Sequence, residues 1–253
     1  MTQEIWEGAI LGAVLGSLVI PGVLWLVRCL QRAWTMSRPA RQTLGGAAVQ
    51  EELCKIFVRD FVIPDGTELY SITPRIGIGT VPNVQELWPD VEGRAVAWIL
   101  NALGELGKTK NIEIVRMSQD QGEWNANVLV LGAQAQKSSD FYQSMQGVGY
   151  RIDGQGIYDS QSGKEVVREK DFGYGNILKA RNPFKSGSAG VAFLIGGFGV
   201  LGTAAAAYYF KENLVTLGKE FGRDCFGVVV RAPVTAGEQA VERLRSLDKR
   251  FGS

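Results

Sequence analysis

The sequence contains no histidine and only three cysteines among its 253 residues. Without histidine the chain cannot form a Ser-His-Asp triad, a Cys-His dyad or the usual zinc centres. Cys29, Cys54 and Cys225 have the spacing of neither a metal knuckle nor a disulfide framework, which favours a reducing compartment. Any chemistry would therefore use carboxylates, lysines, hydroxyls or thiols.

A charge excess of either sign is also missing. The formal net charge is +1 and 21% of the residues are charged, so no global basic field indicates binding to duplex nucleic acid. The hydrophobic fraction of 45% is ordinary for a folded protein, but much of it is concentrated in two blocks. The length allows one sizeable domain with accessory segments, or two small domains.

The first block, residues 8–27, contains no charged residue and has about the 20 residues that cross a bilayer. Acidic residues precede it, and Arg28, Arg32, Arg38 and Arg41 follow it. The positive-inside rule then predicts a single-pass membrane protein, with its N-terminus outside and its C-terminal domain cytoplasmic. A cleaved signal peptide is the alternative, but its first segment should be basic.

Small residues line one face of this predicted span. Gly8, Gly12 and Gly16 recur every four residues, which lets helix backbones approach closely and predicts a homo-oligomer. The alternative is that glycine is simply common in membrane helices. Pro21 and Gly22 would kink the helix, and a pore without charged lining would be weakly selective or gated by an apolar constriction.

Three regions follow from these patterns: the membrane region 1–34, a basic juxtamembrane linker 35–64 and a cytoplasmic domain 65–253. Within the linker we expect a short amphipathic helix over 49–61. The fold class that we expect for 65–253 is α/β, with a Rossmann-like, mostly parallel sheet. The predicted strands are 68–73, 111–117, 126–133, 191–195 and 225–234; the predicted helices are 90–107, 138–145, a helix after 202 and 238–251; and 150–170 is a small antiparallel insertion.

The second apolar block, residues 186–210, has two interpretations. It is uncharged and long enough to span a membrane. It also matches a strand, a glycine turn of the form G-x-G-x-x-G at Gly197, Gly199 and Gly202, and a helix. A second span would place residues 211–253 outside and separate the strand at 225–234 from its sheet, so we favour the strand, turn and helix.

A second glycine turn, RIGIGT, follows the predicted strand 68–73. Two such turns at the carboxyl edge of a parallel sheet would bring backbone N–H groups close to a phosphate. We therefore predict a nucleotide-type ligand and no required cofactor or metal; a packing role for the glycines is the alternative. The predicted ligand residues are Arg75, Gly77, Gly79, Thr80, Gly197, Gly199, Gly202, Thr203 and Asn182, with Asp171, Tyr174, Lys179 and Arg181 as further candidates.

Catalytic groups are hard to find. No spacing pairs Glu123, Asp153, Asp159 or Asp171 on one element, and Cys225 is expected to be a core residue. Asp224 lies about 20 residues after Gly202 but precedes a strand, so a redox dinucleotide is not favoured. An enzyme that works from one carboxylate, such as a nucleotidase or a NAD glycohydrolase, stays open, although a non-enzyme is the preferred interpretation.

The layout of one span, a basic linker and an α/β domain with two glycine turns resembles the single-span membrane effectors of bacterial nucleotide-signalled anti-phage defence, which carry a CRISPR-associated Rossmann-like sensor domain. The resemblance covers the order of the parts and no residue-level motif. It implies a homo-oligomer of the bacterial inner membrane that forms an ion channel or disrupts the membrane when a nucleotide or oligonucleotide second messenger binds. The alternatives are a membrane-anchored enzyme acting on a nucleotide or NAD, and a structural assembly factor with an empty domain.

Overall fold

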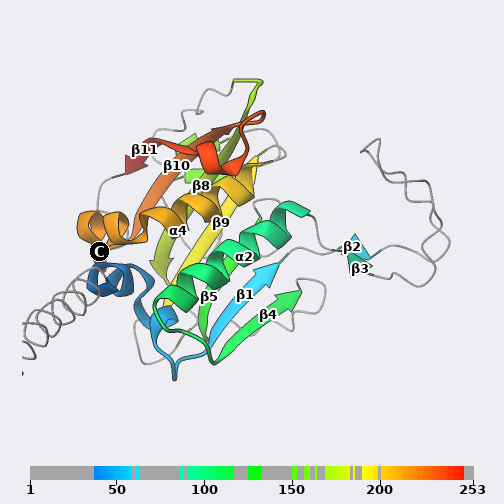
Figure 1. The fold of residues 1–253 in the computed structure, drawn as a ribbon. Helices are drawn as coiled ribbons and strands as arrows, with labels where there is room; N and C mark the ends of the chain where they lie inside the picture. Colours follow the sequence, from blue (N-terminus) through cyan, green and yellow to red (C-terminus); the bar gives the residue numbers. More distant parts are fainter. Residues whose placement is uncertain are drawn as a thin grey trace, which may run out of the picture.

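The structure, a computed structural model, describes residues 37–58, 61–62, 86–87, 90–116, 125–132, 150–152, 157–159, 163, 169–182, 185, 190–198 and 201–247. Its centre is a seven-stranded mixed sheet in the order β11-β10-β8-β9-β5-β1-β4 (Figure 1). The strands are β1 Cys54–Val58, β4 Ile112–Arg116, β5 Asn127–Leu131, β8 Phe172–Arg181, β9 Val191–Phe198, β10 Phe226–Pro233 and β11 Glu242–Leu247.

The sheet has a parallel half and an antiparallel half. Strands β4, β1, β5 and β9 run parallel to one another, whereas β8 is antiparallel to β9, β10 to β8 and β11 to β10. Two short antiparallel ribbons form sheets of their own: β2 Phe61–Val62 with β3 Glu86–Leu87, and β6 Tyr150–Ile152 with β7 Ile157–Asp159. Strand β10 points the same way as β9, because each of the two is antiparallel to β8. Five of the seven strands therefore point in one direction, and the expected α/β class with a mostly parallel sheet is confirmed.

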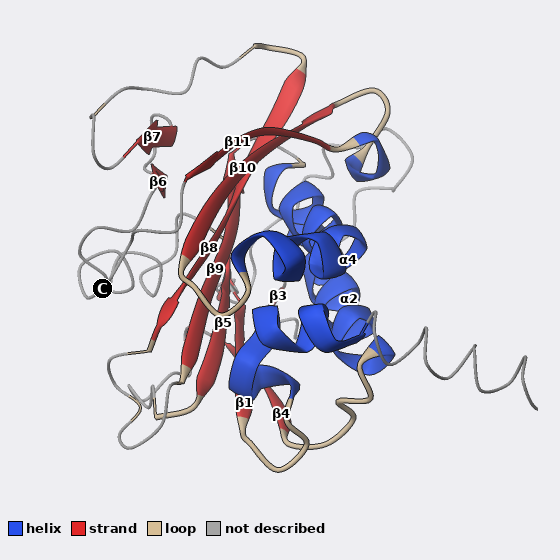
Figure 2. Ribbon diagram, turned by 90° about the vertical axis from the view of Figure 1, so that its left-hand side faces the viewer, coloured by secondary structure: helices blue, strands red, loops and turns tan. Residues whose placement is uncertain are grey.

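The described helices pack on one face of the sheet (Figure 2). They are the helical residues 37–44, η1 Gly45–Ala48, α2 Asp90–Glu105, α4 Gly202–Phe221 and η3 Glu238–Ala240. Trp98 of α2 meets Tyr208 of α4 edge to face at 4.9 Å between ring centroids, and Phe210 meets Phe193 of β9 in the same way at 5.3 Å. Phe193 and Phe210 belong to the larger of two hydrophobic clusters among the described residues, and Trp98 packs against it.

The second cluster lies on the opposite face of the sheet, the side of β6 and β7 in Figure 2. In β9, Phe193 and Ile195 belong to the helix-side cluster, and Ala192 and Leu194 belong to the opposite one. The central strands are therefore buried on both faces, which explains why their sequences are continuous apolar runs instead of alternating ones.

Several predicted elements are confirmed. The helix at 90–107 is α2, and the strands at 111–117, 126–133 and 225–234 are β4, β5 and β10. Residues 191–198 form β9 and residues 202–210 begin α4, so the strand and the helix expected in the second apolar block are confirmed. The insertion at 150–170 contains the antiparallel pair of β6 and β7. Across the described ranges, none of the helices has the length and apolar character that crossing a bilayer requires.

The predicted helix over 49–61 is wrong, because residues 54–58 form β1 in the middle of the parallel half. Ile56, Phe57 and Val58 are each fully buried. Ile56 and Val58 belong to the helix-side cluster, and Phe57 belongs to the opposite one. In a strand that is buried on both faces, consecutive residues are apolar. The apolar residues that suggested one face of a helix are therefore consecutive residues of a buried strand. The sheet thus begins within the segment that the sequence predicts to be a linker.

The predicted helix over 238–251 is also wrong. Residues 242–247 form the edge strand β11, which pairs with β10, and only η3 is helical. Arg243 makes two hydrogen bonds to Glu220 of α4, at 2.7 and 2.6 Å, which holds this strand against the helix layer. The charged residues of β11 suit an edge strand, where they discourage pairing with other chains.

The sequence does not predict the ten-residue strand β8, which contains three of the further ligand candidates, Tyr174, Lys179 and Arg181. Other predictions lie outside the described residues: the span 8–27 with Gly8, Gly12 and Gly16, the strand 68–73, the glycine turn with Arg75, Gly77, Gly79 and Thr80, and the helix 138–145.

Candidate functional site

The glycine turn after β9 is a place of very close backbone packing. A Cβ on Gly197 would lie 2.0 Å from the carbonyl carbon of Gly202, and a Cβ on Gly202 would lie 2.1 Å from the carbonyl oxygen of Tyr174. Thr203 is only 4% exposed. Gly199 lies outside the described residues. Packing of α4 on β8 and β9 therefore accounts for two of the three motif glycines, and their contact with a ligand stays a prediction.

Asn182 lies far from that turn, at the opposite edge of the sheet. Its backbone N–H donates to Gly190, directly before β9, and its side-chain Nδ2 donates to the Ala126 carbonyl at 2.7 Å, directly before β5. The side chain is 4% exposed. The length of β9 separates Asn182 from Gly197, so the structure does not bring these two predicted ligand residues together.

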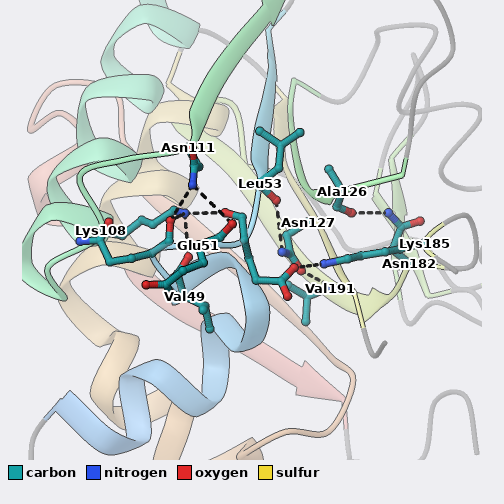
Figure 3. Close-up of polar contacts among 12 residues, drawn as sticks. Val49, Glu51, Leu53, Lys108, Asn111, Ala126, Asn127, Asn182, Lys185 and Val191 are labelled. Carbon is teal, nitrogen blue, oxygen red and sulfur yellow. Dashed lines mark hydrogen bonds and ion pairs between the residues drawn. The ribbon is translucent and has the colours of Figure 1, made fainter. Parts of the chain in front are cut away.

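A polar network at this amino edge joins the loop before β1 to its neighbours (Figure 3). Lys108 Nζ donates to the carbonyls of Val49, Gln50 and Glu52 at 2.7, 3.1 and 2.5 Å. Asn111 donates to the carbonyls of Gln50 and Glu51. The Lys108 side chain is only 1% exposed, and burial lowers its pKa. Its three donors all have acceptors, so we assign it a structural role.

A pocket of about 1250 Å³ opens beside this network. It lies between the segment 37–51, the end of α2, the end of β8, the start of β9 and the turn from α4 to β10. We call it the basic pocket, because only one of its lining residues, Glu51, is acidic and five are cationic. The five cationic residues are Arg38, Arg41, Lys179, Arg181 and Arg223.

Four of these cations are exposed, and the fifth is not. Arg38, Arg41, Arg181 and Arg223 have exposed side chains, and Arg41 also donates to the Leu106 carbonyl at 2.9 Å. Lys179 is 3% exposed. The exposed arginines can attract an anion by their charge, and the buried lysine can bind it where little water screens the interaction.

Burial lowers the pKa of Lys179 to about 8, an effect that Arg223 reinforces and that Cys225 and Asp224 oppose. A lysine in a cavity with a lowered pKa is typical of functional sites. The thiols are less promising. Burial raises the pKa of Cys54 to about 12, so it stays a protonated core residue, while Cys225 is half-buried and lines the basic pocket.

Sequence reasoning found part of this pocket. The sequence indicates Lys179 and Arg181 as further ligand candidates and Arg38 and Arg41 as the arginines that follow the span, but nothing in it indicates Arg223. No local motif could have revealed the group, because its members come from segments far apart in the chain. Within the described residues, no group of three or more His, Cys, Asp and Glu residues is placed to hold a metal ion.

Comparisons of the chain with protein-family models, with curated protein sequences and with solved structures find no match. The candidate site is therefore defined by its own geometry: a basic pocket at the amino edge of the parallel strands, with Lys179 buried in its wall.

Proposed function

We propose that this chain is a self-associating membrane effector whose Rossmann-like domain binds a nucleotide-type ligand in the basic pocket and thereby controls a membrane pore or membrane disruption. The function matches that of the anti-phage effectors that the layout resembles. The ligand position differs from the one that the glycine turns predict, since the pocket lies at the other edge of the sheet.

One observation carries the proposal: a wall of the pocket is made by residues 37–51, which follow the predicted span 8–27 in the chain. Arg38 and Arg41 belong both to the arginine group after the span and to the pocket lining. A ligand bound there contacts the segment that leads to the membrane, so binding energy can act on that segment directly.

The charge and size of the pocket favour a phosphate-bearing ligand. Arginine presents a planar fork of donors that matches phosphate oxygens, and such charge-assisted hydrogen bonds are stronger than neutral ones. The volume of about 1250 Å³ is larger than the roughly 300–1,000 Å³ of usual small-molecule sites. A mononucleotide or a small oligonucleotide therefore fits the pocket.

The test uses the full chain in lipid nanodiscs and measures binding of mononucleotides, NAD and linear and cyclic oligonucleotides by calorimetry. We expect one class to bind, and the double variant Arg181→Glu/Arg223→Glu to bind it about tenfold or more weakly, equal to about 1.4 kcal/mol or more. Lys219→Glu is the matched control, because Lys219 is exposed on α4 and does not line the pocket.

A second measurement separates an effector from an enzyme. The ligand that binds should increase ion flux through liposomes that contain the full chain, and chromatography should recover it unchanged. Binding without flux, together with turnover of the ligand, would replace the effector by a membrane-anchored enzyme. Binding that the double variant leaves unaltered would remove the basic pocket from the proposal.

A further inference from the structure

The two buried lysines at the amino edge of the sheet use their donors differently. Lys108 Nζ has three backbone carbonyls as acceptors. Lys179 Nζ donates to two carbonyls among the described residues, those of Gln42 and Gly222, at 3.3 and 3.2 Å. Both of these distances are at the long end for N–H···O hydrogen bonds, and the centroid of the Phe226 ring lies 6.0 Å from Nζ. Lys179 therefore holds its two carbonyls weakly, and a stronger acceptor can displace one of them.

The two acceptors of Lys179 belong to the ends of two helices. Gln42 lies in the last turn of the helical residues 37–44, and Gly222 directly follows the last residue of α4. Carbonyl groups at a helix C-terminus carry partial negative charge and favour a cation. We call residues 37–44 the connecting segment. From its position on β8, Lys179 thus joins the connecting segment to the end of α4.

Residues 37–44 are also held by other contacts. Arg41, which lines the basic pocket, donates to the Leu106 carbonyl after α2 at 2.9 Å. Thr43 Oγ1 donates to the Leu214 carbonyl at 3.4 Å. A Cβ on Gly218 would lie 2.0 Å from the Pro39 carbonyl oxygen, which shows how closely the segment approaches α4. Among these contacts, the hydrogen bond from Lys179 to Gln42 joins residues 37–44 to the buried cation of the pocket.

We propose that Lys179 couples ligand binding to the connecting segment. An anionic phosphate group in the basic pocket becomes the counter-ion of Lys179, the hydrogen bond to the Gln42 carbonyl is lost, and residues 37–44 loosen from the end of α4. The inference rests on the proposed function, because it takes the ligand of this pocket to carry phosphate. It adds which residue senses the ligand and which contact changes.

The energetic reason is the difference between the two acceptors. A hydrogen bond between an ammonium and a phosphate oxygen is roughly twice as strong as one to a neutral acceptor. A ligand shifts a conformational equilibrium only by its differential affinity for the two states. In the state that has lost the hydrogen bond to Gln42, the Lys179 ammonium is available to the phosphate. The ligand therefore binds this state more tightly than the state in which Lys179 contacts Gln42.

The test uses the full chain in nanodiscs of phosphatidylcholine, with inorganic pyrophosphate as the probe. Calorimetry measures binding, and hydrogen exchange monitored by mass spectrometry follows residues 37–44. We expect pyrophosphate to bind and to speed exchange of 37–44 at least fivefold, the lower end of typical allosteric coupling of about 5–150-fold. Exchange in β5, at the centre of the sheet, should not change.

Two variants sharpen this test. Lys179→Met should show fast exchange of 37–44 without any ligand, and pyrophosphate should add nothing further. Lys219→Met should behave as the wild type, because Lys219 is exposed and lies outside the pocket. The wild-type measurement decides the question by itself if Lys179→Met does not fold.

The outcomes separate the two proposals. Binding of pyrophosphate without any change in the exchange of 37–44 overturns the coupling and leaves the proposed ligand class in place. Binding of neither pyrophosphate nor any nucleotide overturns both. A repeat in nanodiscs that contain phosphatidylglycerol identifies the source of the phosphate: fast exchange there without pyrophosphate assigns it to a lipid headgroup, and fast exchange only with pyrophosphate assigns it to a free ligand.

Discussion

The backbone N–H of Val191 donates to the side-chain Oδ1 of Asn127 at 3.2 Å. The first residue of β5 thereby holds the first residue of β9, and Asn127 Nδ2 donates to the Leu53 carbonyl, directly before β1, at 3.2 Å. One fully buried amide thus fixes three strand starts at the edge of the sheet where the basic pocket lies.

Asn127→Ala should destabilise the protein. The substitution leaves the buried Val191 N–H without its acceptor, which costs about 1–3 kcal/mol, whereas the Leu53 carbonyl keeps the backbone N–H of residue 127 as a donor. We expect a decrease of about 1–3 kcal/mol in the free energy of unfolding, measured by urea denaturation. Asn213→Ala is the control, because Asn213 makes one hydrogen bond, to the Tyr209 carbonyl within α4; an equal loss in both variants would contradict this role of Asn127.

Gly197→Ala should be among the most damaging small substitutions. The added Cβ would lie 2.0 Å from a backbone atom of Gly202, so α4 would have to move away from β9, at a cost of about 3 kcal/mol or more. Gly104→Ala in α2 is the matched control, because no atom lies within 4 Å of its added Cβ, and it should stabilise by up to about 1 kcal/mol. Similar melting temperatures for the two variants would refute the packing role.

Lys108→Met should lower stability by about 3 kcal/mol, because three partly buried hydrogen bonds to backbone carbonyls are lost, each at a cost of about 1 kcal/mol. Denaturant unfolding measures the loss. Lys110→Met is its control, since Lys110 is exposed and only its backbone N–H contacts Gln50. A Lys108→Met variant as stable as the wild type would show that the 49–52 loop does not depend on this lysine.

The free energy of unfolding should depend on pH because of Lys179. Its pKa falls from 10.5 to about 8 on folding, mainly through burial, so between these pH values the unfolded chain binds more protons than the folded chain. The free energy of unfolding should therefore rise with pH across this window. The difference between the wild type and Lys179→Met, measured by denaturation below, within and above the window, isolates the effect; a difference that does not depend on pH would contradict it.

Anion binding should change in the opposite direction over the same window. The Lys179 ammonium loses its charge in the folded protein as the pH passes about 8, and the arginines keep theirs. The affinity for pyrophosphate should then decrease above that pH in the wild type and not in Lys179→Met. Calorimetry at constant ionic strength provides this measurement.

Gly12→Leu combined with Gly16→Leu should abolish self-association and ion flux. Leucine at these positions would hold the helix backbones apart on the face that the four-residue spacing predicts. Crosslinking in membranes and flux through liposomes measure the two effects. Leu11→Ala, which leaves the glycine face intact, is the control, and unaltered oligomers of the double variant would exclude this face as the interface.

Local patterns in the sequence were sufficient for much of the sheet. Continuous apolar runs identified β5, β9 and β10, and helical spacing with a following glycine identified α2. Strand β8 escaped because Gly173 and Gly175 have low strand propensity. The glycines are there because a Cβ on Gly175 would lie 2.4 Å from the Gly202 carbonyl oxygen, a contact between residues distant in the chain.

The structure of the C-terminal segment also depends on residues that are distant in the chain. The charged residues of β11 fit a helix surface as well as an edge strand, and pairing with β10 decides between them. The basic pocket is a further case, since its cations come from residues 38–41, 179–181 and 223.

The sequence by itself determined the α/β class, most central elements and the absence of histidine chemistry, because burial on two faces and helical periodicity are properties of short segments. Only the tertiary structure decided the strand directions, the packing role of Gly197 and Gly202 and the assembly of the basic pocket. Each of these depends on which distant segments become neighbours, and that choice is made by the packing of the whole sheet and its helices.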